Sequence, residues 1–138
     1  MPVSRVNSVE WVSKEPCFGD IVRVKVSFYY HYGIFVSESE VIQFGLPDNV
    51  TQRAEDVRVL ATDVGTFLNG GDIEVGITKT RHSPQKTVEL ARSRIGEAGY
   101  DILHNNCEHF ATECALGKSQ SFLDAVRVSL RQKLGKND

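Results

Sequence analysis

One cysteine stands at the predicted start of a helix in the last third of the chain. Cys107 directly follows Asn105 and Asn106, which predict a turn, and apolar residues at helical spacing then run to Leu116 before Gly117. A helix N-terminus stabilises a thiolate and can hold an oxyanion, because its backbone N–H groups have no partner in the helix. Cys107 is therefore a candidate nucleophile. Free cysteine is also among the most buried residue types, so its neighbours must decide between the two roles.

A nucleophilic cysteine needs a base, and four histidines compete for that role: His31, His82, His104 and His109. His109 lies two residues after Cys107, roughly 200° around a helix, so we expect it to pack or to cap. His104 lies in a loop and His82 in a polar segment, which favours a surface position for both. His31 lies inside an apolar strand, where a partly buried imidazole needs a polar partner. We therefore predict His31 as the base.

Gln43 is the candidate for the partner of that imidazole. It follows His31 by 12 residues, an even separation, so the two share a face of a hairpin only if the loop has an odd number of residues. A loop over residues 37–39 meets this condition and would pair Val36 with Glu40 and Gly33 with Gln43. His31 then lies diagonal to Gln43, at roughly 7–8 Å between Cα atoms. Such loops favour glycine, which is missing here, so a solvent-facing Gln43 stays open as the alternative.

The pattern of apolar residues predicts the elements that carry these side chains. Alternation favours strands over residues 21–26, 28–36, 41–44 and 72–77. Helices are expected over residues 63–68, 84–95, 107–116 and 121–134, the second with Ser83 as N-cap and Pro84 at its first position. Residues 47–58 indicate a polar connection, and residues 100–103 a short extended segment. We expect one α+β domain over residues 1–138, without repeats or a linker.

Composition limits the class of protein. The chain has 138 residues, 41% of them hydrophobic, and a formal net charge of −2, which gives no general attraction to nucleic acid. No stretch is apolar enough for a signal peptide or a membrane span, and three cysteines make no disulfide framework. We expect a soluble, cytoplasmic protein. Residues 119–138 predict a basic amphipathic helix and tail that suit a membrane surface, although docking on its own domain is the commoner use of such a helix.

Metal binding is a weak alternative for the cysteine segment. The set His104, Cys107, His109 and Cys114 has no paired C-x-x-C spacing, which argues against zinc. We expect neither a metal nor a cofactor.

Specific motifs surround the candidate residues. They are the segment from His31 to Val36, the 12-residue step from His31 to Gln43, and above all the run Asn106-Cys107-Glu108-His109-Phe110. These features resemble the lecithin:retinol acyltransferase family, including its small phospholipase/acyltransferase relatives. The resemblance extends from about Pro16 to Gly117 and is thin between Pro47 and Ser83. It implies a circularly permuted papain-like fold, related to the NlpC-type peptidases, in which the histidine strand precedes the cysteine helix.

The resemblance also implies roles for the residues. Cys107 would be the nucleophile, His31 the general base and then acid, and Gln43 would take the third polar position. Lipid-acting animal members usually carry a second histidine there; an amide can orient an imidazole but cannot share its charge. The backbone N–H of Cys107 is our candidate oxyanion donor. Further residues belong to the motifs without an assigned role: Tyr32, Asn106, Glu108 and His109.

The implied reaction is acyl transfer through a thioester, from an acyl-lipid or acyl-ester to an amine, a hydroxyl or water. We expect no carboxy-terminal membrane anchor of the kind that many animal relatives possess, and therefore contact with lipid that is transient or does not occur at all. Two alternatives stay open. One is a cysteine peptidase, amidase or isopeptidase, which amide cleavage would identify. The other is a binding module with a vestigial site, which an ordinary thiol at Cys107 would favour.

Overall fold

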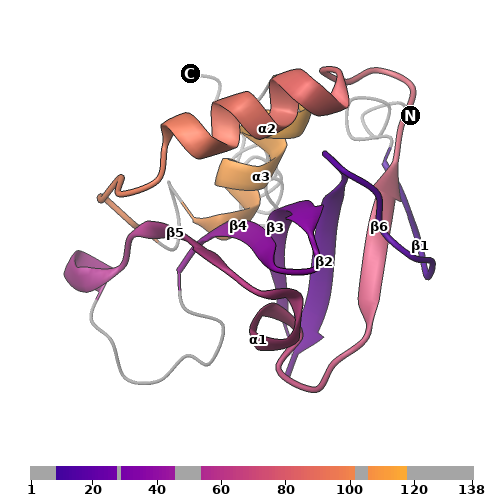
Figure 1. Ribbon diagram of the computed structural model, residues 1–138. Coiled ribbons are helices and arrows are strands. Elements are labelled where there is room, and N and C mark those ends of the chain that lie inside the picture. The colour runs from indigo at the N-terminus through magenta and orange to yellow at the C-terminus, as the bar shows by residue number, and fades with distance from the viewer. Residues whose placement is uncertain (1–8, 28, 46–53, 102–105, 118–138) are drawn as a thin grey trace, which may run out of the picture.

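An antiparallel sheet forms the centre of the molecule. The computed structural model describes residues 9–27, 29–45, 54–101 and 106–117. Its six strands are β1 (Glu10–Val12), β2 (Ile21–Val26), β3 (Tyr29–Ser37), β4 (Glu40–Phe44), β5 (Val59–Thr62) and β6 (Ile73–Ile77). They lie in the order β1-β6-β2-β3-β4-β5, and every neighbouring pair is antiparallel (Figure 1). The strand that carries His31 therefore lies inside the sheet, between β2 and β4.

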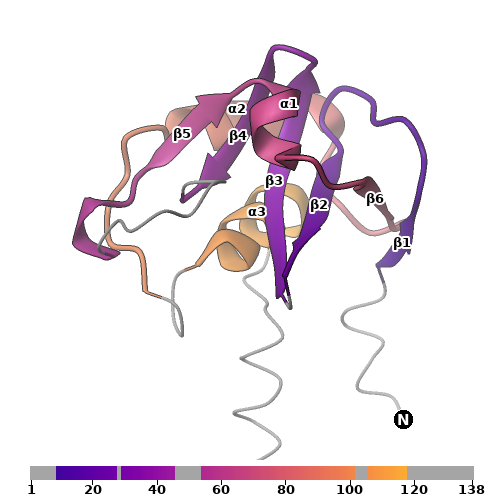
Figure 2. The ribbon, with the colours of Figure 1, turned by 90° about the horizontal axis from the view of Figure 1, so that it is seen from below.

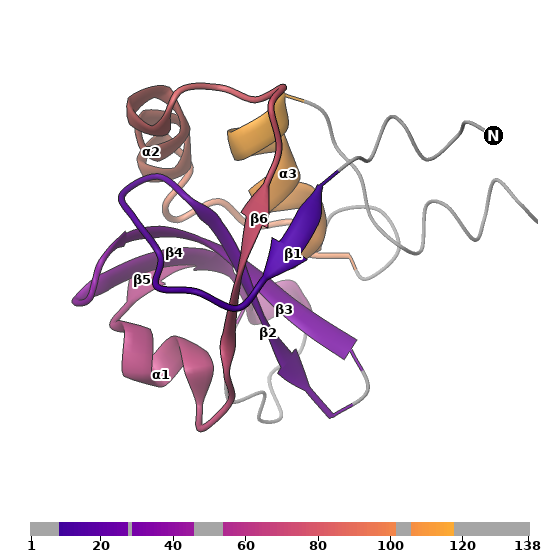
Figure 3. The same cartoon turned by 90° about the vertical axis from the view of Figure 1, so that its right-hand side faces the viewer.

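Helices cover both faces of this sheet. The helices are α1 (Val64–Leu68), α2 (Pro84–Ser93) and α3 (Cys107–Leu116), with a 3-10 turn, η2 (Ala54–Asp56), before β5. Seen from two further directions, α2 and α3 lie on one face and α1 lies on the other (Figure 2 and Figure 3). This arrangement confirms the expected α+β class, with an antiparallel sheet against the helix that starts at Cys107. The expected helix over residues 121–134 lies outside the described residues.

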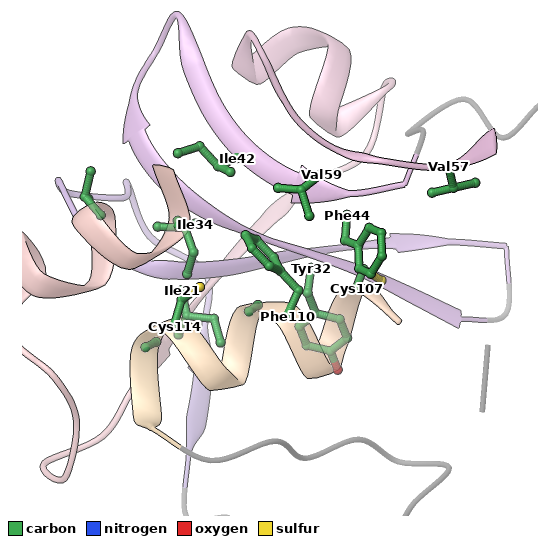
Figure 4. Packing of buried hydrophobic residues seen from close by; sticks show 14 residues of the cluster. Ile21, Tyr32, Ile34, Ile42, Phe44, Val57, Val59, Cys107, Phe110 and Cys114 are labelled. Carbon is green, nitrogen blue, oxygen red and sulfur yellow. The ribbon is translucent and has the colours of Figure 1, made fainter. Parts of the chain in front are cut away.

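The two faces of the sheet carry separate cores, because strand side chains alternate between faces. Under α3, buried strand residues pack with Phe110 and Cys114 of the helix (Figure 4). On the opposite face the strands pack against Phe67 of α1. The buried strand residues of the first face are Ile21, Tyr32, Ile34, Ile42, Phe44 and Val59; those of the second are Val22, Val24, Phe35, Val41 and Val75.

The hairpin of β3 and β4 corrects one predicted pairing. Gly33 pairs with Gln43 as expected, but Ser37, not Val36, pairs with Glu40. The register shifts between Phe35 and Ser37, so the loop has two residues and Val36 is the extra residue of a bulge. A two-residue loop and one bulged residue shift the register as a three-residue loop would. His31 and Gln43 therefore share a face of the hairpin as expected, although the predicted loop was wrong.

Capping residues bound the helices largely as the sequence predicts. Asp63 and Ser83 are N-caps, Pro84 opens α2, and Gly117 ends α3 at a φ of 84°. The expected end of α2 was too late, since the helix stops at Ser93 and Ile95 beyond it is 47% exposed. Within the described residues, no helix is both long enough and apolar enough to cross a bilayer.

Candidate active site

Asn106 fixes the start of α3 and therefore the position of Cys107. Its Oδ1 accepts hydrogen bonds from the backbone N–H of Glu108 at 3.0 Å and of His109 at 3.1 Å. In return, the Asn106 N–H donates to His109 Nδ1 at 3.0 Å. This reciprocal pair is a capping box with histidine in the place that Glu or Gln usually takes. It confirms that His109 caps, and it leaves Cys107 as the first residue of the helix.

The Cys107 thiol lies in a buried, mostly apolar environment. The residue is 8% exposed and belongs to the core cluster that also holds Tyr32 and Phe44. Burial raises the pKa of Cys107 to about 11, and the charge of the neighbouring Glu108 adds to this. Backbone N–H groups near the sulfur oppose the rise in the Cys107 pKa, first among them that of Tyr32. The resting thiol is therefore protonated at neutral pH.

His31 and Gln43 meet as the sequence predicts. His31 is 5% exposed and Gln43 is fully buried, and His31 Nε2 hydrogen-bonds Gln43 Oε1. The amide nitrogen of Gln43 donates to Thr62 Oγ1 of β5 at 3.0 Å. Because an amide oxygen only accepts, Nε2 of His31 carries the proton and Nδ1 keeps its lone pair. Burial lowers the pKa of His31, which the Gln43 hydrogen bond partly offsets, so the imidazole is a neutral base at pH 7.

The thiol and the imidazole approach the same end of the sheet from opposite faces. His31 lies over the Phe67 ring, at 5.2 Å between centroids, on the α1 face, whereas Cys107 packs with Tyr32 on the α3 face. The backbone N–H of Tyr32, in the peptide that joins His31 to Tyr32, lies near enough to the sulfur to oppose the rise in the Cys107 pKa. Among the described residues, no hydrogen bond joins the thiol to the imidazole directly.

Gly45, just beyond the end of the β3–β4 ladder, lies close to His31 and to Tyr100. The observed pairing ends at Gly33 and Gln43, and the chain turns away at Gly45, whose φ is +117°. A Cβ added to Gly45 would lie 4.0 Å from His31 Cε1 and 3.9 Å from Tyr100 Cε1. Burial raises the pKa of the Tyr100 phenol, and the charge of a Cys107 thiolate raises it further. Tyr100 therefore lies near Cys107. The imidazole and the surroundings of the thiol thus converge at Gly45.

The structure places His82 at the last turn of α3, away from Cys107 at its start. His82 is not a solvated surface residue, as the sequence suggested: it is half-buried, and its Nδ1 contacts the carbonyl of Cys114 in the last turn of α3 at 3.0 Å. His104 lies outside the described residues. Within the part of the chain that the structure describes, no three His, Cys, Asp or Glu side chains gather closely enough to hold a metal ion.

Sequence reasoning missed Thr62 and Tyr100 as neighbours of the site, and it misjudged the burial of Arg23. Thr62 ends β5, a strand of only four residues that follows the predicted polar connection over residues 47–58. The short apolar run of this strand was the one signal available in the sequence. Tyr100 precedes the cysteine motif but lies outside any regular element. Arg23, the polar residue of an alternating strand, appeared solvated although its side chain is only 17% exposed.

Comparison with known proteins places the chain in a family. A family model described as lecithin retinol acyltransferase matches residues 14–120. The mouse protein named lecithin retinol acyltransferase is 27% identical over 146 residues, covering 83% of this chain and 63% of the relative, and the human protein of that name is 25% identical with the same coverage. Human phospholipase A and acyltransferase 3 is 27% identical over 127 residues, covering 82% of this chain and 77% of the relative. The chain thus spans less than two thirds of the length of the lecithin retinol acyltransferases that it matches. Because the family model covers most of its residues, the chain belongs to the lecithin retinol acyltransferase family.

Proposed function

We propose that this protein transfers acyl groups through a thioester on Cys107, with His31 as general base and Gln43 as the group that orients the imidazole. The observation that carries the proposal is the place of the thiol. Cys107 begins α3 and packs in one buried cluster with Tyr32, the residue that follows His31 on β3. The His31 imidazole is neutral and is hydrogen-bonded to Gln43. Family membership supports the same chemistry.

The first half of the reaction begins from a protonated thiol. His31 Nδ1 accepts the proton of Cys107, directly or through one water, while the sulfur attacks the carbonyl carbon of the donor ester. The π electron pair of the carbonyl moves onto its oxygen, and the backbone N–H of Cys107 at the helix start is the candidate donor to this oxyanion. When the intermediate collapses, the ester C–O bond breaks and His31 returns the proton to the leaving alcohol.

The second half releases the acyl group. His31 takes a proton from the acceptor, which is water, a hydroxyl or an amine, and the acceptor attacks the thioester carbonyl. When that intermediate collapses, the C–S bond breaks and the Cys107 sulfur takes the proton back from His31, which restores the thiol and the neutral imidazole. A thiol with a high resting pKa favours this concerted use of the base over a permanent thiolate–imidazolium pair.

We infer the substrate class from the names of the relatives. These names, lecithin retinol acyltransferase and phospholipase A and acyltransferase, point to phospholipid acyl esters as donors. Transient contact with a membrane surface accompanies such substrates. The papain-like relation of the fold, a single domain over residues 1–138 and a cytoplasmic location remain predictions.

Intact-mass spectrometry tests the proposal. The protein is incubated with a phosphatidylcholine and, separately, with a short activated acyl ester, and released product is assayed in the same tubes. We expect a hydroxylamine-labile acyl adduct on the wild type, its loss in Cys107→Ala and its slower formation in His31→Ala. Cys17→Ala is the matched control, because Cys17 is exposed and remote in sequence from the motif, and it should form the adduct as the wild type does.

The other outcomes separate the alternatives. If neither adduct nor product appears with either ester, but an amide-linked peptide is cleaved in a Cys107-dependent way, the protein is a peptidase or amidase. If none of these substrates reacts, the site is vestigial and the domain binds without catalysis. Product without an adduct means that the thioester turns over quickly, and the Cys107→Ala variant then decides whether Cys107 is the nucleophile.

A further inference from the structure

Residue 33 is a glycine in the interior of the sheet, where glycine weakens a strand. The backbone does not require it, because the φ of Gly33 is not positive. Space does: a Cβ added to Gly33 would lie 3.0 Å from Phe67 Cε1 and 3.0 Å from Val41 Cγ1. Both distances are shorter than an ordinary contact between carbon atoms. The missing side chain therefore lets the Phe67 ring lie directly on β3.

The ring that uses this space also faces the proposed base. The centroids of the Phe67 and His31 rings are 5.2 Å apart, a separation typical of interacting rings, and their planes are inclined by 34°. His31 and Gly33 are two residues apart on β3, so both positions lie on the same face of the sheet. Phe67 is only 1% exposed. Its ring thus covers one face of the imidazole.

The segment that carries Phe67 is fixed to the sheet. The Val64 N–H donates to the carbonyl of Glu38, in the β3–β4 loop, at 2.9 Å. Two residues earlier, Thr62 ends β5 and accepts from the Gln43 amide at 3.0 Å. Residues 62–67 therefore contact both the proposed base and the amide that orients it.

A single hydrogen bond does not fix an imidazole. The χ2 torsion of histidine has broad minima, so a ring held only at Nε2 can still tilt. A second ring packed against its face removes this freedom, as a precise site requires. We propose that Phe67 is a positioning residue for His31: seated on Gly33, it confines the imidazole to the orientation in which Nε2 meets Gln43 and Nδ1 keeps its lone pair. This inference rests on the proposed function in taking His31 as the base.

The test is 15N nuclear magnetic resonance of the histidine rings in the full chain without substrate. The shifts of Nδ1 and Nε2 report which nitrogen carries the proton, and at pH 8 the measurement is above the unperturbed histidine pKa of about 6.5. His31→Gln identifies the His31 signals. We expect one tautomer in the wild type, with the proton on Nε2. In Phe67→Leu the two shifts should move toward each other, because a ring that tilts away from Gln43 populates the second tautomer.

Phe35→Leu is the matched control. Phe35 lies on the same face of β3 and in the same core cluster as Phe67, and it is 7% exposed. Its substitution removes a comparable ring but keeps the one that faces His31. The His31 shifts should not change. With an activated acyl ester, Phe67→Leu should lower kcat about 10-fold and leave KM within a factor of about two, whereas Phe35→Leu should change neither.

Gly33→Ala tests the same contact and leaves both rings in the chain. Its Cβ should push the Phe67 ring away from β3 and move the His31 shifts in the same direction as Phe67→Leu does. In a Phe67→Leu background this effect should shrink to less than half, because the ring that the Cβ displaces is gone. Circular dichroism checks that each variant is folded. If Phe67→Leu does not fold, Gly33→Ala carries the comparison with Phe35→Leu.

Three results of the spectra would overturn the inference. The first is a wild-type pair of His31 shifts in folded Phe67→Leu, or in Gly33→Ala where that variant replaces it. The second is an equal change in Phe35→Leu, because any loss of packing would then loosen the imidazole. The third is an undiminished effect of Gly33→Ala in the Phe67→Leu background.

The kinetic result is read separately from the spectra. In a protein that is active on the ester, an unchanged kcat in Phe67→Leu would also overturn the positioning role, because the reaction would not depend on the orientation of His31. A failure of the proposed function has a different signature. The His31 shifts would then respond to Phe67→Leu as expected, while the wild type forms no thioester and releases no acyl product.

Discussion

At the scale of single residues, substitutions of Gln43 test whether an amide is sufficient to orient the proposed base. It accepts from His31 Nε2 through its oxygen and donates to Thr62 through its nitrogen. Gln43→Leu removes both and leaves the Nε2–H of a buried imidazole without a partner, which costs about 1–3 kcal/mol of stability. We expect kcat for an activated acyl ester to fall about 10- to 100-fold, less than the loss when a buried carboxylate is removed from a triad. Steady-state kinetics, with circular dichroism to check folding, measures this.

Gln43→His is the matched control for that substitution. A neutral imidazole accepts at one nitrogen and donates at the other, so it can replace both hydrogen bonds of the amide. We expect kcat within a few-fold of the wild type. Thr62→Val should also be mild, because it leaves the hydrogen bond between His31 and Gln43 in place. If Gln43→Leu were as active as Gln43→His, the proposed orienting role would be wrong.

The residues of the site were easier to predict than their environment. Types and spacing selected Cys107, His31 and Gln43, because a thiol at a helix start and an even strand separation are local features. The burial of these side chains could not be predicted from their local sequence. The raised pKa of Cys107 and the lowered pKa of His31 come from residues far along the chain, which no spacing reveals.

The Asn106 cap links element to chemistry, because it sets both the stability of α3 and the position of its first residue. Asn106→Ala removes an acceptor for two backbone N–H groups and should lower the free energy of unfolding by about 0.5–2 kcal/mol. Asn106→Asp keeps an oxygen there and should retain the melting temperature. It adds a negative charge beside the thiol and should therefore slow Cys107 alkylation. Thermal unfolding and iodoacetamide rates together measure both effects.

Ser83→Ala is the control at the scale of the element. Ser83 caps α2 by accepting from the Lys86 N–H at 3.1 Å, so its loss removes a comparable cap on another helix. We expect a similar loss of stability and an unchanged rate for Cys107. Equal rates in Asn106→Asp and the wild type would contradict the electrostatic part of this argument.

Elements with a strong local signal were predicted and short edge strands were missed. The helices at Asp63, Ser83 and Asn106 have caps that satisfy backbone N–H groups within a few residues. The edge strands β1, of three residues, and β5, of four, exist through pairing with distant partners, β6 and β4. Because β5 was missed, so was Thr62 as the second partner of Gln43. The bulge at Val36 was equally hidden, since a loop of odd length has the same parity.

At the scale of the whole molecule, burial of these titratable groups limits the pH range of the fold. His31 has a lowered pKa in the folded state, so below the unfolded value of 6.5 the unfolded chain binds more protons. The contribution of His31 to the free energy of unfolding is then complete above pH 6.5, and it falls as the pH decreases, by up to about 1.4 kcal/mol per pH unit. Burial raises the pKa of Cys107 and of Cys114 to about 11, from an ordinary value of 9.0. Each thiol therefore stabilises the fold below pH 9.0, and this contribution is lost as the pH rises toward 11.

The fold should thus be most stable between about pH 6.5 and 9 and should weaken on both sides. Urea midpoints measured by circular dichroism at pH 5.5, 7.5 and 10 would show this as a maximum at the middle value. His31→Gln removes the buried imidazole and should flatten the acid side, while Cys114→Ala should reduce the loss on the alkaline side. Cys17→Ser is the control for the latter, because Cys17 is exposed and should leave the alkaline side unchanged. A midpoint that stays constant from pH 5.5 to 10 would mean that the thiols and the imidazole are solvated in the folded protein, and the concerted proton transfer proposed for Cys107 and His31 would then lose its physical basis.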